Sequence, residues 1–301
     1  MTVSHTARKP PWLRVRLPEP APFRATAGLL DELRLHTVCD EARCPNKGEC
    51  FGAGTATFLI LGDDCTRACA FCAVGCKGGD GTRGHRASPD PDEPRRLAEA
   101  ARRLGLSHVV VTSVTRDDLS DGGAAHYAAT VAAVRVALPG AAVELLVPDF
   151  RGAVAPLRTV LAAAPDVLAH NLETVPRLYP AVRPAATFER SLALLRRVAR
   201  ARGDRDRPLV KTGLMVGLGE TMDEVDAVLA DCVAAGVELV TIGQYLQPGP
   251  RCREVARYVA PAEFDALGER GAALGLHVVA GPFVRSSYRA GEALATVESD
   301  R

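Results

Sequence analysis

Short apolar runs alternate with longer amphipathic stretches along most of the chain beyond residue 50. The apolar runs are rich in β-branched residues, which is typical of strands buried in a parallel sheet. Six such strands are expected, at residues 55–62, 108–114, 143–148, 166–171, 208–217 and 237–245. The stretches between them carry apolar residues at helical spacing. This alternation predicts a series of parallel βα units.

Two of the expected helices have recognisable ends. The stretch 92–105 closes on Gly105, a residue type favoured just past a helix C-terminus. The stretch 220–236 opens with the capping-box pair Thr221 and Glu224. Cys232 falls inside this second helix, and we expect it to be a small buried core residue.

The number of βα units predicts an α/β fold, a partial TIM-like (β/α)6 barrel with N- and C-terminal extensions. A doubly wound open sheet is disfavoured because no dinucleotide-binding glycine motif opens the first unit. We expect an N-terminal extension at 1–54, the barrel at 55–260, and a C-terminal helix, strand and Arg-Ser-Ser-Tyr segment at 261–301. In such a barrel the active site lies on the loops that follow the strands.

Charge and hydropathy indicate which partners and which location to expect for the protein. The 37 Lys and Arg residues nearly balance the 36 Asp and Glu residues, for a formal net charge of +1 over 301 residues. This balance gives no reason to expect a nucleic acid or an anionic membrane as partner. The start of the chain lacks the apolar stretch of a secretion signal, and no apolar run is long enough to cross a membrane. We therefore expect a cytoplasmic protein.

The cysteines indicate metal or redox chemistry. Thiols in the cytoplasm stay reduced, so clustered cysteines there are more typical of metal or redox sites than of disulfides. Six of the nine cysteines form two triplets, Cys39, Cys44 and Cys50 at C-x4-C-x5-C, and Cys65, Cys69 and Cys72 at C-x3-C-x2-C. Three closely spaced thiolates can bind three irons of a 4Fe-4S cluster and leave the fourth iron open. Structural zinc is the alternative at both triplets, with Cys76 as a possible fourth ligand of the second.

The second triplet, with Phe71 before its last cysteine, resembles the signature of the radical S-adenosylmethionine enzymes. Further stretches resemble the lipoyl synthases within that superfamily and span nearly the whole chain in order. Among them are HTVCDEARCPNKGECF (36–51), TATFLILGDDCTRACAFCAV (55–74), NLETVPRLYPAVRP (171–184) and GPFVRSSY (281–288). Biotin synthase, another radical sulfur-inserting enzyme, is disfavoured by the upstream triplet and the Arg-Ser-Ser-Tyr segment. A zinc-stabilised binding module is the non-enzymatic alternative.

The resemblance implies insertion of sulfur at C6 and C8 of an octanoyl chain linked to a lysine of a lipoyl carrier domain. Such domains occur in 2-oxoacid dehydrogenases and in the glycine cleavage H protein. These carbons are unactivated, so neither acid-base nor nucleophilic catalysis can act on them and a cofactor is required. By resemblance, a cluster on Cys65, Cys69 and Cys72 passes an electron from a donor such as ferredoxin or flavodoxin to S-adenosylmethionine, releasing methionine and a 5'-deoxyadenosyl radical.

The resemblance also implies that Cys39, Cys44 and Cys50 hold an auxiliary 4Fe-4S cluster that is consumed as the sulfur donor. Its fourth ligand comes from the Arg-Ser-Ser-Tyr segment. We place this ligand on Ser287, with Ser286 as the alternative. A serine oxygen is a harder ligand than a thiolate, and we expect it to be the first to release the cluster.

Other polar residues near strand ends are candidates for cofactor binding. Asn171 and Glu173 match the family's NLET motif after the fourth strand, where a barrel loop could hydrogen-bond the ribose or amino group of S-adenosylmethionine, and Arg183 could meet its carboxylate. A helix cap or a surface ion pair is the alternative for each of the three. Asp121 either caps the following helix or lines the active site. Gln244 and Tyr245 end the sixth strand at the same mouth, with the same alternatives.

The chain departs from the family pattern at a few positions. Ala169 stands where an Asn is usual, and Cys252 and Arg253 stand where a His-Leu pair is common. We expect none of these to touch a cluster ligand, and we take Cys76 and Cys252 as incidental. Isolated histidines such as His36 and His126 are expected to be hydrogen-bonded structural residues.

Overall fold

The structure is a computed structural model that describes residues 9–15, 18–74, 87–203 and 206–301. One eight-stranded sheet runs through it in the order β1-β2-β3-β4-β5-β6-β7-β8. The six predicted strands are all present and parallel to their neighbours, as β2 (Thr57–Ile60), β3 (His108–Ser113), β4 (Ala142–Leu146), β5 (Val167–Ala169), β6 (Leu209–Val216) and β7 (Leu239–Gln244). The predicted α/β fold is therefore correct.

Two further strands extend the sheet at its edges. β1 (His36–Thr37) pairs antiparallel with β2, and β8 (His277–Gly281) pairs parallel with β7. Among the described strands β8 does not pair with β1, so the barrel is open. The two edge strands come from opposite ends of the chain. The segments that follow them, near residues 40 and 285, therefore both lie against the barrel.

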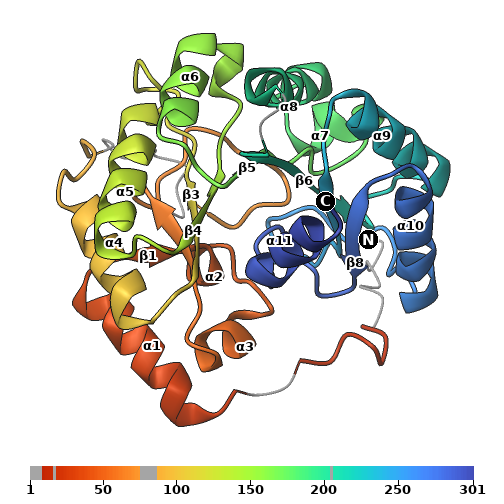
Figure 1. Ribbon diagram of the computed structural model, residues 1–301. Coiled ribbons are helices and arrows are strands. Elements are labelled where there is room, and N and C mark those ends of the chain that lie inside the picture. The colour runs from red at the N-terminus through yellow and green to blue at the C-terminus, as the bar shows by residue number, and fades with distance from the viewer. Residues whose placement is uncertain (1–8, 16–17, 75–86, 204–205) are drawn as a thin grey trace.

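Helices surround the sheet on its outer face, as Figure 1 shows. Those that follow barrel strands are α4 (Glu93–Arg103), α5 (Ala124–Ala137), α6 (Val154–Ala162), α7 (Tyr179–Val182), α8 (Phe188–Arg202), α9 (Met222–Ala234) and α10 (Pro261–Ala273). Short 3-10 turns precede α6 and α7, at Phe150–Gly152 and Pro176–Leu178. The N-terminal segment forms α1 (Pro20–Glu32), α2 (Val38–Glu41) and α3 (Lys47–Gly52), and α11 (Ala290–Ser299) ends the chain.

The predicted helix ends follow the expected chemistry. Thr221 caps α9, and its capping box with Glu224 is complete. Gly105 and Gly236 follow α4 and α9 with φ of +65° and +76°, a conformation that glycine adopts without steric cost. Cys232 is fully buried, as predicted.

One end of the barrel is closed by α11. Its Leu294 and Val297 pack against the first residues of three central strands, in a cluster with Val167, Leu209 and Leu239. Above this plug, Lys211 Nζ lies 2.7 Å from Glu144 Oε1, and His108 Nε2 lies 3.1 Å from Glu144 Oε2. The opposite end of the barrel, where the strands have their C-termini, is not covered by α11 and is where an active site lies in such a fold. None of the helices in the described part of the chain is long and apolar enough to cross a membrane.

Candidate active site

The first cysteine triplet lies on the two short helices near the N-terminus. Cys39 is on α2, Cys44 follows it in a turn, and Cys50 is on α3. Burial raises the pKa of Cys39 to about 12, although the Thr57 backbone N–H donates to its sulfur and opposes the shift. Burial likewise raises the pKa of Cys50 to about 11. The free thiols are therefore protonated at neutral pH, and a metal binding here displaces protons.

The C-terminal segment lies against this triplet. Asn46 Nδ2 donates to the carbonyl of Phe283 at 2.7 Å, between Cys44 and Cys50 in the sequence. Tyr288 Oη donates to Glu49 Oε1 at 2.8 Å, beside Cys50. These contacts bring the Arg-Ser-Ser-Tyr segment and the first triplet together across more than two hundred residues of sequence.

The two serines of this segment point to different places. Thr57 Oγ1 donates to Ser287 Oγ at 2.6 Å, and the same residue's N–H donates to the Cys39 sulfur. Ser286 Oγ instead donates to Asn171 Oδ1 at 3.0 Å. Ser287 is therefore the serine beside the first triplet, while Ser286 contacts a residue at the end of β5.

The second triplet lies on the loop between β2 and α4, at the C-terminal ends of the strands. Backbone hydrogen bonds fasten this loop to three neighbours. Thr66 N–H donates to Thr115 at 2.9 Å, Ala70 N–H donates to Val182 at 2.9 Å, and the Ala70 carbonyl accepts from Arg253 N–H at 2.7 Å. Burial raises the pKa of Cys72 to about 12, and it raises the pKa of Cys69 as well.

A buried ionic network anchors the same loop through Arg67. Its guanidinium donates to Asp117 at 2.8 and 2.9 Å and to Asp149 Oδ1 at 2.6 Å. Asp149 Oδ2 accepts from Arg190 Nε on α8 at 2.7 Å. Burial alone would raise the pKa of Asp149, but the Arg67 guanidinium holds it well below its usual range. This network was not predicted from the sequence. The features that could have indicated it are the acidic residues Asp117 and Asp149, which follow two successive strands, and Arg67 within the second cysteine motif.

Three predicted cofactor-binding residues come together beside the second triplet. Asn171 Nδ2 donates to Glu173 Oε1 at 3.1 Å, and Arg183 Nη1 donates to the Asn171 carbonyl at 2.9 Å. Burial raises the pKa of Glu173, with Arg183 opposing the shift. The charges of Glu173 and Arg183 both act on the Cys69 thiol. Arg183 is also the C-cap residue of α7, and none of the three forms an exposed ion pair among the described contacts.

Arg183 carries an unusual buried donor. Its side chain is buried, and its Nε has no hydrogen-bond partner among the described residues. Such an orphaned donor is costly unless a ligand or water accepts from it. A bound carboxylate would satisfy it.

The spread of the sulfur atoms tests zinc against a cubane cluster. A tetrahedral zinc with bonds of about 2.3 Å holds its thiolates roughly 3.8 Å apart. Across the described residues, the group of three potential ligands whose ligand atoms all lie within 4.8 Å of one another is His36, Glu41 and Asp63, and neither cysteine triplet meets that limit. A cubane binds each thiolate to a separate iron, so its thiolates lie farther apart than those of a single zinc ion. Neither triplet is drawn together around one small ion in the described part of the structure.

Comparison with known proteins agrees with this donor chemistry. The model of the Radical SAM superfamily matches residues 59–232, and the model of the N-terminal domain of lipoyl synthase matches residues 2–44. A lipoyl synthase of Nitratidesulfovibrio vulgaris is 55% identical over 95% of this chain and 93% of its own length. One of Trichlorobacter lovleyi is 57% identical over 94% of this chain and 97% of its own length. The chain belongs to the lipoyl synthase family.

Two solved structures share the fold of this chain at low sequence identity. The hydrogenase maturase HydG aligns with a TM-score of 0.58 at 13% identity, over 79% of this chain and 54% of its own. Methylornithine synthase aligns with a TM-score of 0.52 at 15% identity, over 91% of this chain and 92% of its own. Both alignments support the fold described above and carry no argument about activity.

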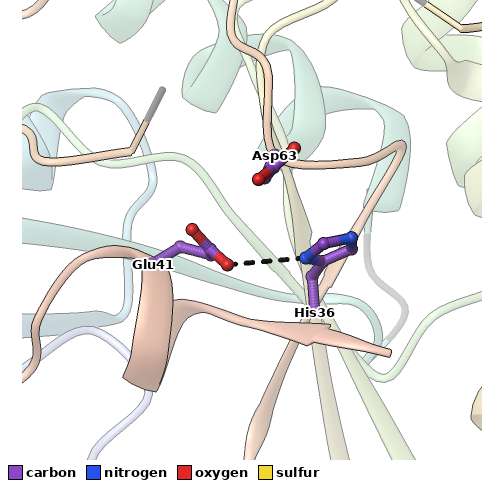
Figure 2. Close-up of side chains that lie close together, drawn as sticks. All are labelled: His36, Glu41 and Asp63. Atoms are coloured by element: carbon purple, nitrogen blue, oxygen red, sulfur yellow. Dashed lines mark hydrogen bonds and ion pairs between the residues drawn. The ribbon is translucent and has the colours of Figure 1, made fainter. Parts of the chain in front are cut away.

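His36, Glu41 and Asp63 form a close group of polar side chains (Figure 2). His36 is on β1, Glu41 ends α2, and Asp63 precedes Cys65. His36 Nδ1 and Glu41 Oε1 are 3.5 Å apart, with the Asp63 carboxylate facing them. We interpret the group as an ionic contact that joins the segments carrying the two triplets, which agrees with the predicted structural role of His36.

One expectation about the family departures is wrong. Cys252 was expected to touch no cluster ligand, but its thiol donates to the Cys72 carbonyl at 3.6 Å. Arg253 also contacts the loop, through its N–H bond to Ala70. Both residues lie in the segment after β7, whose approach to the β2 loop could not be read from local sequence. Cys76 lies outside the described residues.

The remaining candidates are structural. Asp121 accepts from the N–H groups of Gly123 and Ala125 at 2.9 and 2.8 Å, so it caps α5. Gln244 Nε2 donates to backbone carbonyls, Tyr245 Oη donates to the Arg253 carbonyl at 2.6 Å, and both side chains are buried. Asp121 is therefore a helix cap, as one of its two alternatives had it, whereas Gln244 and Tyr245 are neither caps nor ion pairs among the described contacts.

Proposed function

We propose that Cys65, Cys69 and Cys72 bind the 4Fe-4S cluster that holds S-adenosylmethionine. Cys39, Cys44, Cys50 and Ser287 bind an auxiliary 4Fe-4S cluster that supplies the sulfur inserted at C6 and C8 of a protein-bound octanoyl-lysine. The observation that carries this assignment is the position of Ser287, which shares Thr57 with Cys39 although it lies 230 residues from Thr57. Together the bound groups supply one-electron chemistry that can activate an alkane C–H bond, which no side chain can do.

The chain's own residues bind and orient these groups. The orphaned Nε of Arg183 supports a role in binding the carboxylate of S-adenosylmethionine. The contacts of Asn171 with Glu173 and Arg183 support a role for Glu173 and Asn171 in accepting hydrogen bonds from the amino or ribose groups of S-adenosylmethionine. Ser287 contributes a hard oxygen ligand to a site otherwise made of thiolates, so the auxiliary cluster has one weak tether and can be dismantled from that side.

The three segments of the chain divide this work. Residues 1–54 supply the auxiliary cysteines, residues 55–260 supply the barrel and the cofactor site, and residues 261–301 supply Ser287.

The acyl substrate is carried by a lipoyl carrier domain of a 2-oxoacid dehydrogenase or of the glycine cleavage H protein. A small electron carrier such as ferredoxin or flavodoxin supplies the electron. Cysteine ligands must stay reduced, so we place the protein in the cytoplasm, where thiols are kept reduced.

The test separates the two triplets by their products. Cys69→Ala should abolish formation of 5'-deoxyadenosine, and with it the lipoyl product. Cys44→Ala should abolish the lipoyl product while 5'-deoxyadenosine still forms from S-adenosylmethionine, reductant and an octanoylated carrier. Cys232→Ala, a buried cysteine outside both triplets, should retain both products. Lipoyl product from the Cys44 variant would show that the first triplet is not the sulfur donor.

A further inference from the structure

The turn into the second cysteine loop is made by a residue in a rare conformation. Leu61 directly follows β2 and has φ of +68°. The left-handed region is uncommon for residues with a side chain, since Cβ approaches the following carbonyl. Such a residue persists when its surroundings hold it there. Four residues later the chain reaches Cys65, so the direction of this turn fixes where the loop begins.

Two side chains hold the backbone of Leu61 from outside the loop. Its N–H donates to Glu93 Oε2 at 2.9 Å, and its carbonyl accepts from Arg116 Nη1 at 3.4 Å. Glu93 is the first residue of α4 and is 5% exposed, and Arg116, which follows β3, is 3% exposed. A buried N–H without an acceptor is unfavourable, so this contact favours the observed turn over alternatives that would point the N–H elsewhere.

His126 on α5 holds the Glu93 carboxylate in turn. Its Nε2 lies 2.7 Å from the same Oε2 atom that accepts from Leu61, and its side chain is 9% exposed. The carboxylate oxygen can only accept, so Nε2 donates. The oxygen is thereby fixed by two donors from different elements, which leaves it little freedom to move away from the Leu61 N–H.

The side chain of Leu61 is confined from the opposite direction. Gly123, which has φ of +87°, lies against it, and a Cβ atom at that position would come within 2.3 Å of Leu61 Cδ1. Leu61 itself is 5% exposed. The turn is therefore held both by hydrogen bonds to its backbone and by packing of its side chain.

We propose that Glu93 and His126 form a positioning pair for the radical step: by holding Leu61 in the left-handed conformation, they set the position of the loop that carries Cys65, Cys69 and Cys72. The proposal rests on the proposed function, in which that loop binds the cluster holding S-adenosylmethionine. Neither residue touches the reacting atoms, and both act through the backbone of Leu61. Loss of the carboxylate should let the turn relax and displace the cluster from the cofactor-binding residues Glu173 and Arg183.

The first experiment compares Glu93→Ala with Glu93→Gln in the holoenzyme. Glu93→Ala leaves the Leu61 N–H without its acceptor, and we expect 5'-deoxyadenosine formation to fall about tenfold, with a raised KM for S-adenosylmethionine. Glu93→Gln keeps an oxygen that can accept, and its rate should stay within about threefold of the native rate. The matched control is Glu99→Ala on the exposed face of α4, where Glu99 pairs only with Arg102 among its described contacts, and it should change nothing.

A spectroscopic readout separates positioning from general damage. The Glu93→Ala enzyme should keep its iron content, while the change in the electron paramagnetic resonance spectrum of the reduced cluster on adding S-adenosylmethionine should be weakened. An unchanged spectral response and an unchanged KM would overturn the proposal. If Glu93→Ala does not fold, His126→Ala supplies the same test, with a smaller expected loss of about threefold because the carboxylate remains.

The decisive control asks whether the effect passes through Leu61. Glycine adopts the left-handed conformation without steric cost. In a Leu61→Gly background, Glu93→Ala should therefore cost less than about threefold instead of about tenfold. An equal cost in both backgrounds would contradict a role through this turn. Failure of the underlying assignment is distinguishable, because it would appear as 5'-deoxyadenosine formation by Cys69→Ala, whatever Glu93 does.

Discussion

The two cysteine triplets use the same donor atoms but are assembled in different ways. The second triplet lies within eight residues of one barrel loop, and its neighbours hold that loop by backbone hydrogen bonds and by Arg67. The first triplet is spread over α2 and α3 and meets its serine only through contacts that span 230 to 239 residues. On the proposed assignment, the cysteines of the radical site all come from one loop, whereas the sulfur-donor site requires both ends of the chain.

The two sites also differ in what stabilises them. The fully buried Asp149 carboxylate forms ion pairs with Arg67 of the second-triplet loop and with Arg190 of α8. An ion pair of Lys47 with Asp40 joins α2 and α3, but the contacts of the first triplet's segment with the C-terminal segment are neutral hydrogen bonds or involve the exposed Glu49. On the proposed assignment, a firmly held second-triplet loop suits a cluster that must survive each turnover. The weaker attachment of the C-terminal segment to the first triplet suits a cluster that is dismantled to release sulfur.

The largest expected effect separates the neighbouring serines. Ser287→Ala should reduce the lipoyl product to background while 5'-deoxyadenosine formation stays near the native level, because only the auxiliary site loses a ligand. Ser286→Ala removes the hydrogen bond to Asn171 and should instead weaken binding of S-adenosylmethionine by about fivefold, with product still formed. Both products and the KM are measured by mass spectrometry of the same reactions. Identical behaviour of the two variants would remove the distinction drawn between them.

The next effect tests the rigidity of the radical loop. Asp149→Ala leaves Arg67 buried without one of its partners, and we expect a loss of about 3–5 kcal/mol in the free energy of unfolding. Asp117→Ala removes the more exposed partner of Arg67 and should cost about 1–2 kcal/mol. Anaerobic urea denaturation measures both. Equal costs would show that Asp149 is not the anchor of the loop.

The smallest effect is a dependence on pH that originates behind the radical loop. His170 is fully buried, its Nδ1 donates to the Val147 carbonyl at 2.8 Å, and burial followed by the nearby Arg183 lowers its pKa to about 4. The unfolded chain takes up this proton near pH 6.5, before the folded chain does, so stability is complete above pH 6.5 and falls as the pH drops toward 4. Asp149 and Arg67 are the other charged groups acting on this ring.

Between pH 6.5 and 5 this single group should cost roughly 2 kcal/mol in the free energy of unfolding. The decrease should be absent from His170→Gln, which cannot titrate. Denaturation curves of both proteins at the two pH values measure the difference. A variant with the same pH dependence as the native enzyme would assign the decrease to other groups.

The sequence alone could predict whatever depends on neighbours in the chain. Apolar runs located all six central strands, and the pair Thr221 and Glu224 located the start of α9. Both cysteine triplets followed from spacing. Contacts between distant segments were beyond local patterns: the Arg67 network joins the loops after β2, β3 and β4, and the contact of Cys252 with Cys72 spans 180 residues.

The resemblance assigned the serine ligand to the Arg-Ser-Ser-Tyr segment but could not separate Ser287 from Ser286. Adjacent residues share the same sequence context, and only their side-chain partners differ, Thr57 for one and Asn171 for the other. The turn at Leu61 was equally hidden, because a leucine carries no local signal for a left-handed backbone. Such positions are determined by packing from elements that lie far away in sequence.

The most direct test of two separate cluster sites is the iron and acid-labile sulfide content of the anaerobically purified enzyme. The account predicts about eight of each per native chain, because each 4Fe-4S cluster contains four irons and four sulfides. Cys44→Ala and Cys69→Ala should each retain about four of each, since the remaining triplet is intact. Zinc without sulfide, or loss of all iron when a single triplet is altered, would contradict it.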